Sequence, residues 1–144
     1  MIRKILVPTD GSELSVKAIR GAVEVAKKLG AKIVGMTAIE PYSFSSMSEY
    51  RPETFEVFEK RTETIAKERL KQVESIAKAA DVEFETNVSK SFSPYEAIIE
   101  AATETGCDAI FMASHGRRGL NAVLLGSETQ KVLTHSRIPV MVYR

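Results

Sequence analysis

The sequence predicts an α/β fold, an open five-stranded parallel sheet with helices on both faces. Strand-like and helix-like hydrophobic patterns alternate from one end of the chain to the other. Several of the strand-like runs are continuously apolar, which is typical of strands that helices cover on both sides. This alternation favours parallel strands joined by right-handed crossovers. The chain of 144 residues has the size of one domain, and we expect a single domain over residues 1–144.

The first strand and the first helix have clear signals. Residues 5–7 are all apolar and predict a buried strand. Residues 10–12, Asp-Gly-Ser, predict a turn in which Ser12 caps the following helix. Apolar residues then recur at helical spacing as far as Gly30, and glycine commonly ends helices.

The middle of the chain predicts a strand, a loop and a long helix. Residues 33–39 form a second apolar run and predict a buried strand. Residues 40–51 contain Pro, Tyr, Phe, Met and four serines, so we expect an irregular loop there. Residues 52–80 predict a long helix with one apolar face. In residues 82–87 apolar and polar side chains alternate, which indicates a strand near a sheet edge with one face in water.

Two helices and two strands remain. Ser93, Pro94 and Glu96 predict a helix start with a serine cap, proline in the first turn and a capping-box glutamate. The apolar run at residues 109–112 predicts the fourth strand, and a short helical pattern follows at about residues 127–133. Residues 139–143 predict the fifth strand.

Composition excludes several classes of protein. The chain is 44% hydrophobic and 27% charged with a formal net charge of +1, which is ordinary for a globular protein. A charge so close to zero gives no case for a nucleic-acid or membrane-surface partner. The single cysteine, Cys107, excludes an intrachain disulfide and fits a reducing compartment, and the first residues lack a signal-peptide pattern. We therefore expect a cytoplasmic protein.

The most informative motif follows the fourth strand. It runs from Ala113 through Ser-His to Gly116, continues for nine residues, and reaches Gly126 and Ser127 at the start of a helix. Glycine lets a backbone approach an anion closely, and the N–H groups of a first helical turn point at it. The spacing matches neither a P-loop nor the Rossmann fingerprint. We expect a phosphate-binding loop of a different kind.

A second polar loop, residues 8–11, follows the first strand. Ligands of open parallel sheets bind beyond the carboxyl ends of the strands, where the strand order reverses. If the first and fourth strands are neighbours, both loops face one crevice. Asp10 can then accept hydrogen bonds from ribose hydroxyls, and Arg117 and Arg118 can add positive charge against a polyphosphate.

Each of these features has a simpler interpretation, which stays open at this stage. Asp10 can serve only to turn the chain into the first helix. Gly116 and Gly126 can be turn residues, and the arginine pair can be a solvated part of a loop. His115 is a weak candidate for catalysis, because the sequence near it offers no second group at a metal or dyad spacing.

The chain resembles the ATP-binding branch of the universal stress protein family. The resemblance rests on the opening residues 4–12, the closing residues 138–142, and the motif G-x2-G-x9-G-(S/T), in which Ala113 replaces the first glycine. It implies a sheet in the order 3-2-1-4-5, within the adenine-nucleotide alpha hydrolase-like group of folds. At a strand end Ala113 keeps extended backbone geometry, which tolerates its methyl group.

The resemblance also implies a nucleotide site. Asp10 would bind the ribose, backbone around Thr9 and Ala38 would meet the adenine, and the glycine loop with the first turn of the following helix would bind the ribose and phosphates. The complete set of expected nucleotide-binding residues is Pro8, Thr9, Asp10, Ala38, Met112, Ala113, Gly116, Arg117, Gly126, Ser127, Glu128 and Thr129.

Two functions from different classes fit these residues. The first is an ATP-dependent regulatory module of the stress response that acts as a homodimer through its last strand and on a protein partner that the sequence does not identify. The second is a slow ATPase or phosphotransferase that uses the same pocket, with ATP bound together with Mg²⁺. An interaction protein without a ligand would leave the glycine spacing unexplained. The apolar side chains of residues 40–51 predict either a flap over the base or packing on the long helix.

Overall fold

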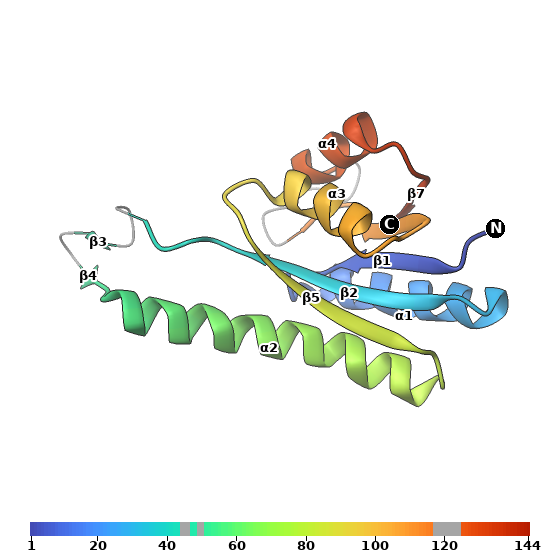
Figure 1. Ribbon diagram of the computed structural model, residues 1–144, viewed down its shortest axis with the longest axis horizontal. Coiled ribbons are helices and arrows are strands. Elements are labelled where there is room, and N and C mark those ends of the chain that lie inside the picture. The colour runs from blue at the N-terminus through green and yellow to red at the C-terminus, as the bar shows by residue number, and fades with distance from the viewer. Residues whose placement is uncertain (44–46, 49–50, 117–124) are drawn as a thin grey trace.

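Five parallel strands form the central sheet of the computed structural model, which describes residues 1–43, 47–48, 51–116 and 125–144. The sheet order is β5-β2-β1-β6-β7 (Figure 1). Counted along the chain, these strands stand in the order 3-2-1-4-5, which confirms the expected topology. Their bounds are β1 Lys4–Pro8, β2 Lys32–Ile39, β5 Phe84–Lys90, β6 Ala109–Ala113 and β7 Val140–Tyr143.

Helices cover both faces of this sheet, as expected. Helices α1 (Glu13–Leu29) and α2 (Phe55–Ala79) pack on one face, and α3 (Pro94–Glu104) and α4 (Ser127–His135) pack on the other (Figure 1). In β1, Val7 belongs to the core under α1 and α2, whereas its neighbour Leu6 belongs to the core under α3 and α4. Both side chains are completely buried, which explains why the middle of the strand, residues 5–7, is apolar at every position. No helix in the described ranges is long and apolar enough to cross a membrane.

The ends of α1 match the sequence prediction. The Ser12 hydroxyl accepts a hydrogen bond from the backbone N–H of Ser15 at 3.2 Å and thereby satisfies one of the first amides of the helix. Gly30 ends the helix with a φ of 66°, a left-handed conformation that glycine adopts without steric cost.

The start of α3 differs from the prediction. The helix begins at Pro94, but within the described chain the Ser93 side chain makes no capping hydrogen bond. Ser93 is held instead by Ser91, whose hydroxyl accepts from the Ser93 N–H at 3.0 Å. The first amide of α3, that of Tyr95, donates to the carboxylate of Glu128 at 2.8 Å. A residue from α4 therefore takes the role that the capping-box interpretation assigned to a local side chain.

The segment between β2 and α2 is more regular than expected. Strands β3 (Met47–Ser48) and β4 (Arg51–Pro52) pair in an antiparallel ladder. The ladder falls in the predicted irregular loop except for Pro52, which was expected to begin the long helix that starts at Phe55. Tyr42 packs edge-on against Phe55 and Phe58, with ring centroids 5.5 and 5.3 Å apart. Of the two alternatives predicted for this segment, a flap over the base or packing on the long helix, Tyr42 follows the second. Residues 44–46 and 49–50, on which the flap prediction also falls, lie outside the described residues.

Helix α2 approaches the sheet closely at one point, where Gly35 of β2 lies under Val73. A Cβ atom added to Gly35 would lie 2.7 Å from Val73 Cγ1, closer than two carbon atoms can come. Val73 is completely buried, so it has little room to withdraw. The absence of a side chain at position 35 therefore sets the distance between α2 and β2.

Replacing Gly35 with Ala is expected to destabilise the fold by about 1–3 kcal/mol, because the added methyl forces α2 and β2 apart. In a Val73→Ala background the same substitution should cost less, since both Cγ atoms, including the closest one at 2.7 Å, are gone and only Cβ at 3.0 Å remains. Urea unfolding of the four proteins in this double-mutant cycle measures the coupling. Equal costs of Gly35→Ala in both backgrounds would contradict this account of the packing.

Asp108 joins the beginnings of β1 and β6. Its Oδ2 atom accepts hydrogen bonds from the backbone N–H groups of Arg3 at 2.8 Å and Lys4 at 3.0 Å. These two bonds hold the pKa of the Asp108 carboxyl below its usual value of 3.8. The charged form thus stabilises the folded state above that value, and the stabilisation is lost as the pH falls through the lowered pKa.

The Asp108→Asn protein should accordingly be less stable than the wild type near neutral pH, with a difference that shrinks as the pH falls below about 4. Thermal unfolding of both proteins between pH 7 and pH 2.5 tests this expectation. A stability difference that stays constant over the whole range would show that the charge of Asp108 contributes nothing.

Candidate functional site

The two polar loops predicted from the sequence meet at the centre of the sheet. Strands β1 and β6 are parallel neighbours, with Ile5 opposite Ala109, so their carboxyl ends lie side by side. The chain order of the strands reverses at this point, which is where parallel sheets bind ligands. A Cβ atom added to Gly116 would collide with Asp10 Oδ2. The two loops are therefore in contact, and with the first turn of α4 they form what we call the crevice.

Asp10 has the simpler of the two roles that the sequence left open, that of a turn residue, and its second carboxylate oxygen faces the glycine loop. Its Oδ1 atom accepts from the backbone N–H of Ser12 at 2.9 Å and so turns the chain into α1. Its Oδ2 atom faces Gly116. The turn is held further by Thr9, whose buried hydroxyl accepts from the N–H of Gly11 at 3.1 Å and pairs with the Ser15 hydroxyl at 3.0 Å. The Asp10 carboxylate is thus fixed in position before any ligand arrives.

The start of α4 is attached directly to the end of β6. The N–H of Gly126 donates to the carbonyl of Ser114 at 2.7 Å, and the buried hydroxyl of Thr129 donates to the carbonyl of Ala113 at 3.0 Å. A Cβ atom on Gly126 would lie 3.1 Å from the Cα of His115, so a larger residue would crowd this junction. No side chain in the described parts of the chain caps α4. The amides of its first turn, from Ser127 onward, can serve an anion.

The other residues expected to bind the nucleotide on or after β6 differ in which of their groups can face the crevice. Ala113 is the last residue of the strand and has extended geometry, as expected, so its methyl group requires no strained backbone. Met112 packs its side chain into the core with Leu6 and Val34, and only its backbone can face a ligand. Arg117, together with Arg118, lies outside the described residues.

The expected adenine contacts lie at the ends of β1 and β2. Pro8 ends β1 opposite Met36, and the next amide, that of Thr9, donates to the Met36 carbonyl at 2.8 Å. Even-numbered residues of β2 therefore point their backbone groups toward β1, and those of Ala38 face the end of that strand. The carbonyl of Thr9 accepts the hydroxyl of Thr37 at 2.8 Å.

Sequence reasoning missed two polar residues that support this end of the sheet. Arg69 of α2 donates through Nη1 to the Thr37 hydroxyl at 3.2 Å and lies 3.5 Å from the carbonyl of Ala38. Thr37 itself is completely buried. A signal for Arg69 was present, because it falls at helical spacing between the buried residues Ala66 and Val73. A cation on an apolar helix face needs a polar partner, and here that partner is the end of β2.

The described residues contain no group of three or more His, Cys, Asp or Glu side chains that could hold a metal ion. His115 is near the crevice, and its Nδ1 atom lies 3.2 Å from the Ser114 hydroxyl. Cys107 is buried, and burial raises the pKa of its thiol, which disfavours the reactive thiolate form.

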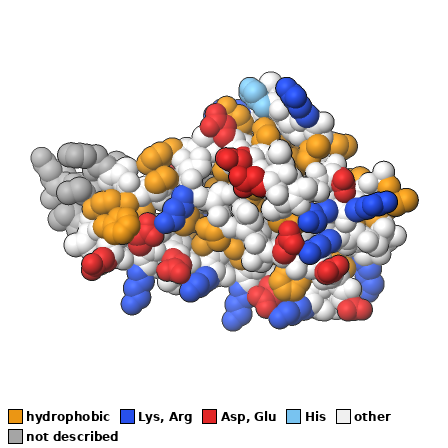
Figure 2. Space-filling model, in the orientation of Figure 1, with side chains coloured by type: hydrophobic (Ala, Val, Ile, Leu, Met, Phe, Trp, Pro, Cys, Tyr) orange, Lys and Arg blue, Asp and Glu red, His pale blue; other side chains and the backbone are white. Residues whose placement is uncertain are grey.

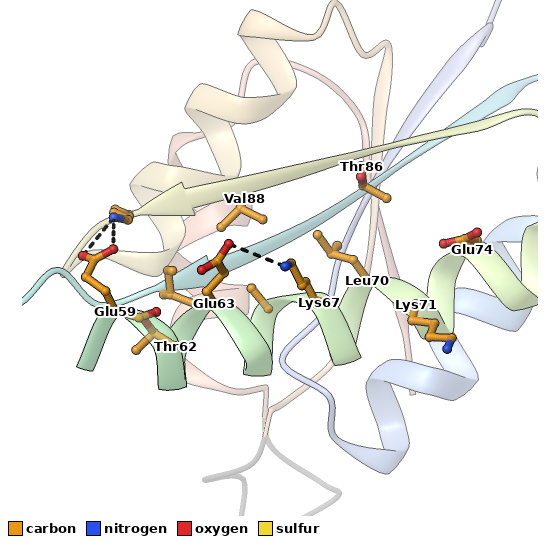
Figure 3. A pocket seen from close by; sticks show the side chains of 12 residues that line it. Glu59, Thr62, Glu63, Lys67, Leu70, Lys71, Glu74, Thr86 and Val88 are labelled. Atoms are coloured by element: carbon orange, nitrogen blue, oxygen red, sulfur yellow. Dashed lines mark hydrogen bonds and ion pairs between the residues drawn. The ribbon is translucent and has the colours of Figure 1, made fainter. Parts of the chain in front are cut away.

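A second concave surface, a groove of about 660 Å³, lies between α2 and the edge strand β5. Its floor includes Leu70 and the half-exposed Val88 (Figure 3). Charged residues on its rim pair with each other: Lys90 with Glu59 at 2.9 Å, and Lys67 with Glu63 at 3.6 Å. Acidic and basic side chains are interspersed over the described part of the face seen in Figure 2. The loops that the sequence predicts to bind a nucleotide lie at the crevice, on the other side of β2.

Comparisons with known proteins identify relatives along the whole chain. A model of the universal stress protein family matches residues 1–144. The chain is 37% identical over 151 residues to the universal stress protein YxiE of Bacillus subtilis strain 168, and the match covers all of both chains. It is 30% identical to the universal stress protein MJ0577 of Methanocaldococcus jannaschii, covering 100% of this chain and 96% of that protein.

Solved structures share the same fold. Universal stress protein UspA from Lactobacillus plantarum superposes with a TM-score of 0.82 at 22% identity, covering 99% of this chain and 98% of its own. A universal stress protein in complex with cAMP has a TM-score of 0.72 at 24% identity, covering 99% and 97%. One from Archaeoglobus fulgidus in complex with dAMP has a TM-score of 0.66 at 18% identity, covering 100% and 98%.

Proposed function

The chain belongs to the universal stress protein family, and from this premise we propose that it is a regulatory module whose ligand is ATP. The observation that carries the proposal is the contact between Gly116 and Asp10, since it brings a carboxylate fit for a ribose beside a loop fit for phosphates. Two proteins of the same fold are complexes with cAMP and dAMP, which are both adenine nucleotides. They support a nucleotide as the class of ligand.

The crevice suits the parts of a nucleotide in order. Asp10 accepts hydrogen bonds from the ribose hydroxyls, and the backbone of Ala38 meets the base. The phosphates lie over Gly116 and the first turn of α4, where main-chain amides and the helix dipole favour negative charge. Gly126 keeps this junction narrow, because it adds no side chain between α4 and His115.

We assign a regulatory rather than a catalytic role, and a cytoplasmic location in keeping with the single cysteine. ATP occupancy then acts by stabilising one arrangement of the loops over another, and an unidentified protein partner responds to it. Hydrolysis of ATP with Mg²⁺ is the alternative. Measuring phosphate release from ATP in the presence of the protein and Mg²⁺ decides between them, since a regulator leaves bound ATP intact over many hours.

Gly126→Val is expected to weaken ATP binding about tenfold or more, because a branched side chain forces α4 away from Ser114 and His115 and displaces its amides from the phosphates. Isothermal titration calorimetry with ATP measures the effect. Gly30→Ala is the control: it strains the left-handed end of α1, far from the crevice, and should lose stability but keep wild-type affinity. Equal ATP affinities for the wild type and Gly126→Val, or no binding by either, would refute the assignment.

We also propose that the protein forms a homodimer through β7. This strand is at the edge of the sheet, and its Met141 side chain is 46% exposed. The carbonyls of Pro139 and Tyr143 accept hydrogen bonds from β6, so the odd-numbered residues of β7 direct their backbone groups toward β6. The backbone groups of the even-numbered residues, Val140 and Val142, therefore point to the open edge. An exposed apolar edge can pair with a second copy about a two-fold axis.

Val142→Pro should produce monomers, because it removes an N–H group on the open edge without touching the bonds between β7 and β6. Light scattering at micromolar concentration gives the mass, and circular dichroism verifies the fold. Met141→Pro is the contrasting variant: it removes an N–H that bonds to β6, so it should destabilise the fold itself. A monomeric wild type would refute the proposal, as would a Val142→Pro protein that remains dimeric.

A further inference from the structure

Glu128 connects the beginnings of two helices. It lies in the first turn of α4, yet its Oε2 atom accepts the backbone N–H of Tyr95 in the first turn of α3 at 2.8 Å. Its Oε1 atom lies 3.5 Å from Lys131 Nζ, and the same ammonium group sits 5.5 Å from the centre of the Tyr95 ring. The carboxylate is therefore held between α3 and α4.

Helix α3 depends on this contact because its local signals leave its first amide unsatisfied. Pro94 has no N–H group, and in the described chain Ser93 contributes no side-chain cap. Glu96, the residue expected to complete a capping box, instead accepts the hydroxyl of Tyr95 at 3.1 Å. Glu128 supplies both the hydrogen-bond acceptor and the negative charge that favour a helix beginning.

The direction of the Glu128 side chain also matters for α4. A carboxylate in the first turn of a helix can fold back on the amides of its own helix and satisfy them. Here the amide of Tyr95 and the ammonium of Lys131 hold it on the side of α3. The amides of α4 that adjoin Gly126 are left to a ligand.

We propose that Glu128 is a positioning residue that couples the nucleotide crevice to α3, an inference that rests on the proposed function. Bound phosphates order the first turn of α4, and with it the carboxylate that anchors α3. The negative charge of Glu128 repels the phosphates and so lowers the affinity for ATP. Its hydrogen bond to Tyr95 has a different effect: when bound phosphates order the first turn of α4, this bond also stabilises the start of α3. By linkage, tighter anchoring of α3 must in turn favour ATP.

Three variants separate the charge from the hydrogen bond. Glu128→Gln keeps an acceptor for Tyr95 but removes the charge, so it should bind ATP about two- to fivefold more tightly than the wild type. Its affinity for adenosine, which lacks phosphates, should be unchanged. Glu128→Ala removes both features, and Glu100→Gln on the exposed side of α3 is the control with the same change in net charge. Calorimetric titrations with ATP and adenosine give the comparison.

Hydrogen exchange of the Tyr95 amide reads the contact directly. Without nucleotide it should be about tenfold faster in Glu128→Ala than in the wild type, and close to wild-type in Glu128→Gln. Added ATP should slow it in the wild type and in Glu128→Gln but not in Glu128→Ala. ATP binding that is equal in the wild type and Glu128→Gln, with Tyr95 exchange indifferent to ATP, would overturn the coupling and leave the proposed function standing. A wild type that binds no ATP would overturn the proposed function itself.

Discussion

The pairing of β1 with a strand on each side is the constraint on which the rest of the structure depends. β1 is hydrogen-bonded to β2 on one edge and to β6 on the other. The sheet then continues outward from β2 to β5 on one side and from β6 to β7 on the other. The middle of a central parallel strand must be apolar on both faces, so its polar residues lie at or beyond its two ends. Asp10 is the second residue after that end, and the loop after β6 reaches it there. The position of the crevice thus follows from the position of one strand in the sheet.

Glycines allow two of the helices to lie close to the sheet and to the loop after β6. Gly35 lets α2 settle on the backbone of β2, and Gly126 lets α4 settle against the loop after β6. Both contacts bring a helix close to backbone rather than to a side chain. In the first case the result is a dense core around Val73, and in the second it is a helix start directed at the crevice. The same packing device shapes the core in one place and the proposed nucleotide site in the other.

Polar groups around the crevice support one another across elements that are distant in sequence. Arg69 from α2 reaches Thr37 at the end of β2, and the Thr37 hydroxyl reaches the carbonyl of Thr9 at the end of β1. Glu128 joins α4 to α3 on the other face of the sheet. The crevice is consequently connected to both helical layers by hydrogen bonds to charged groups, which are stronger than bonds between neutral partners. A nucleotide bound there, as we propose, would adjoin groups that are hydrogen-bonded to helices on both sides.

The sequence by itself determined the fold class, the order of the five sheet strands and the four helices along the chain, and the two polar loops, because hydrophobic periodicity, Gly30 and Ser12 are local signals that tertiary contacts did not override. It also indicated Asp10 and Gly116 separately, from turn chemistry and spacing. Only the tertiary structure decided that these two residues touch, that Met112 turns its side chain into the core, and that Glu128 rather than Ser93 caps α3. A side chain can meet a partner 33 residues away only after the strands have paired. Such contacts depend on the register of the sheet and the approach of the helices, and no short stretch of sequence encodes either one.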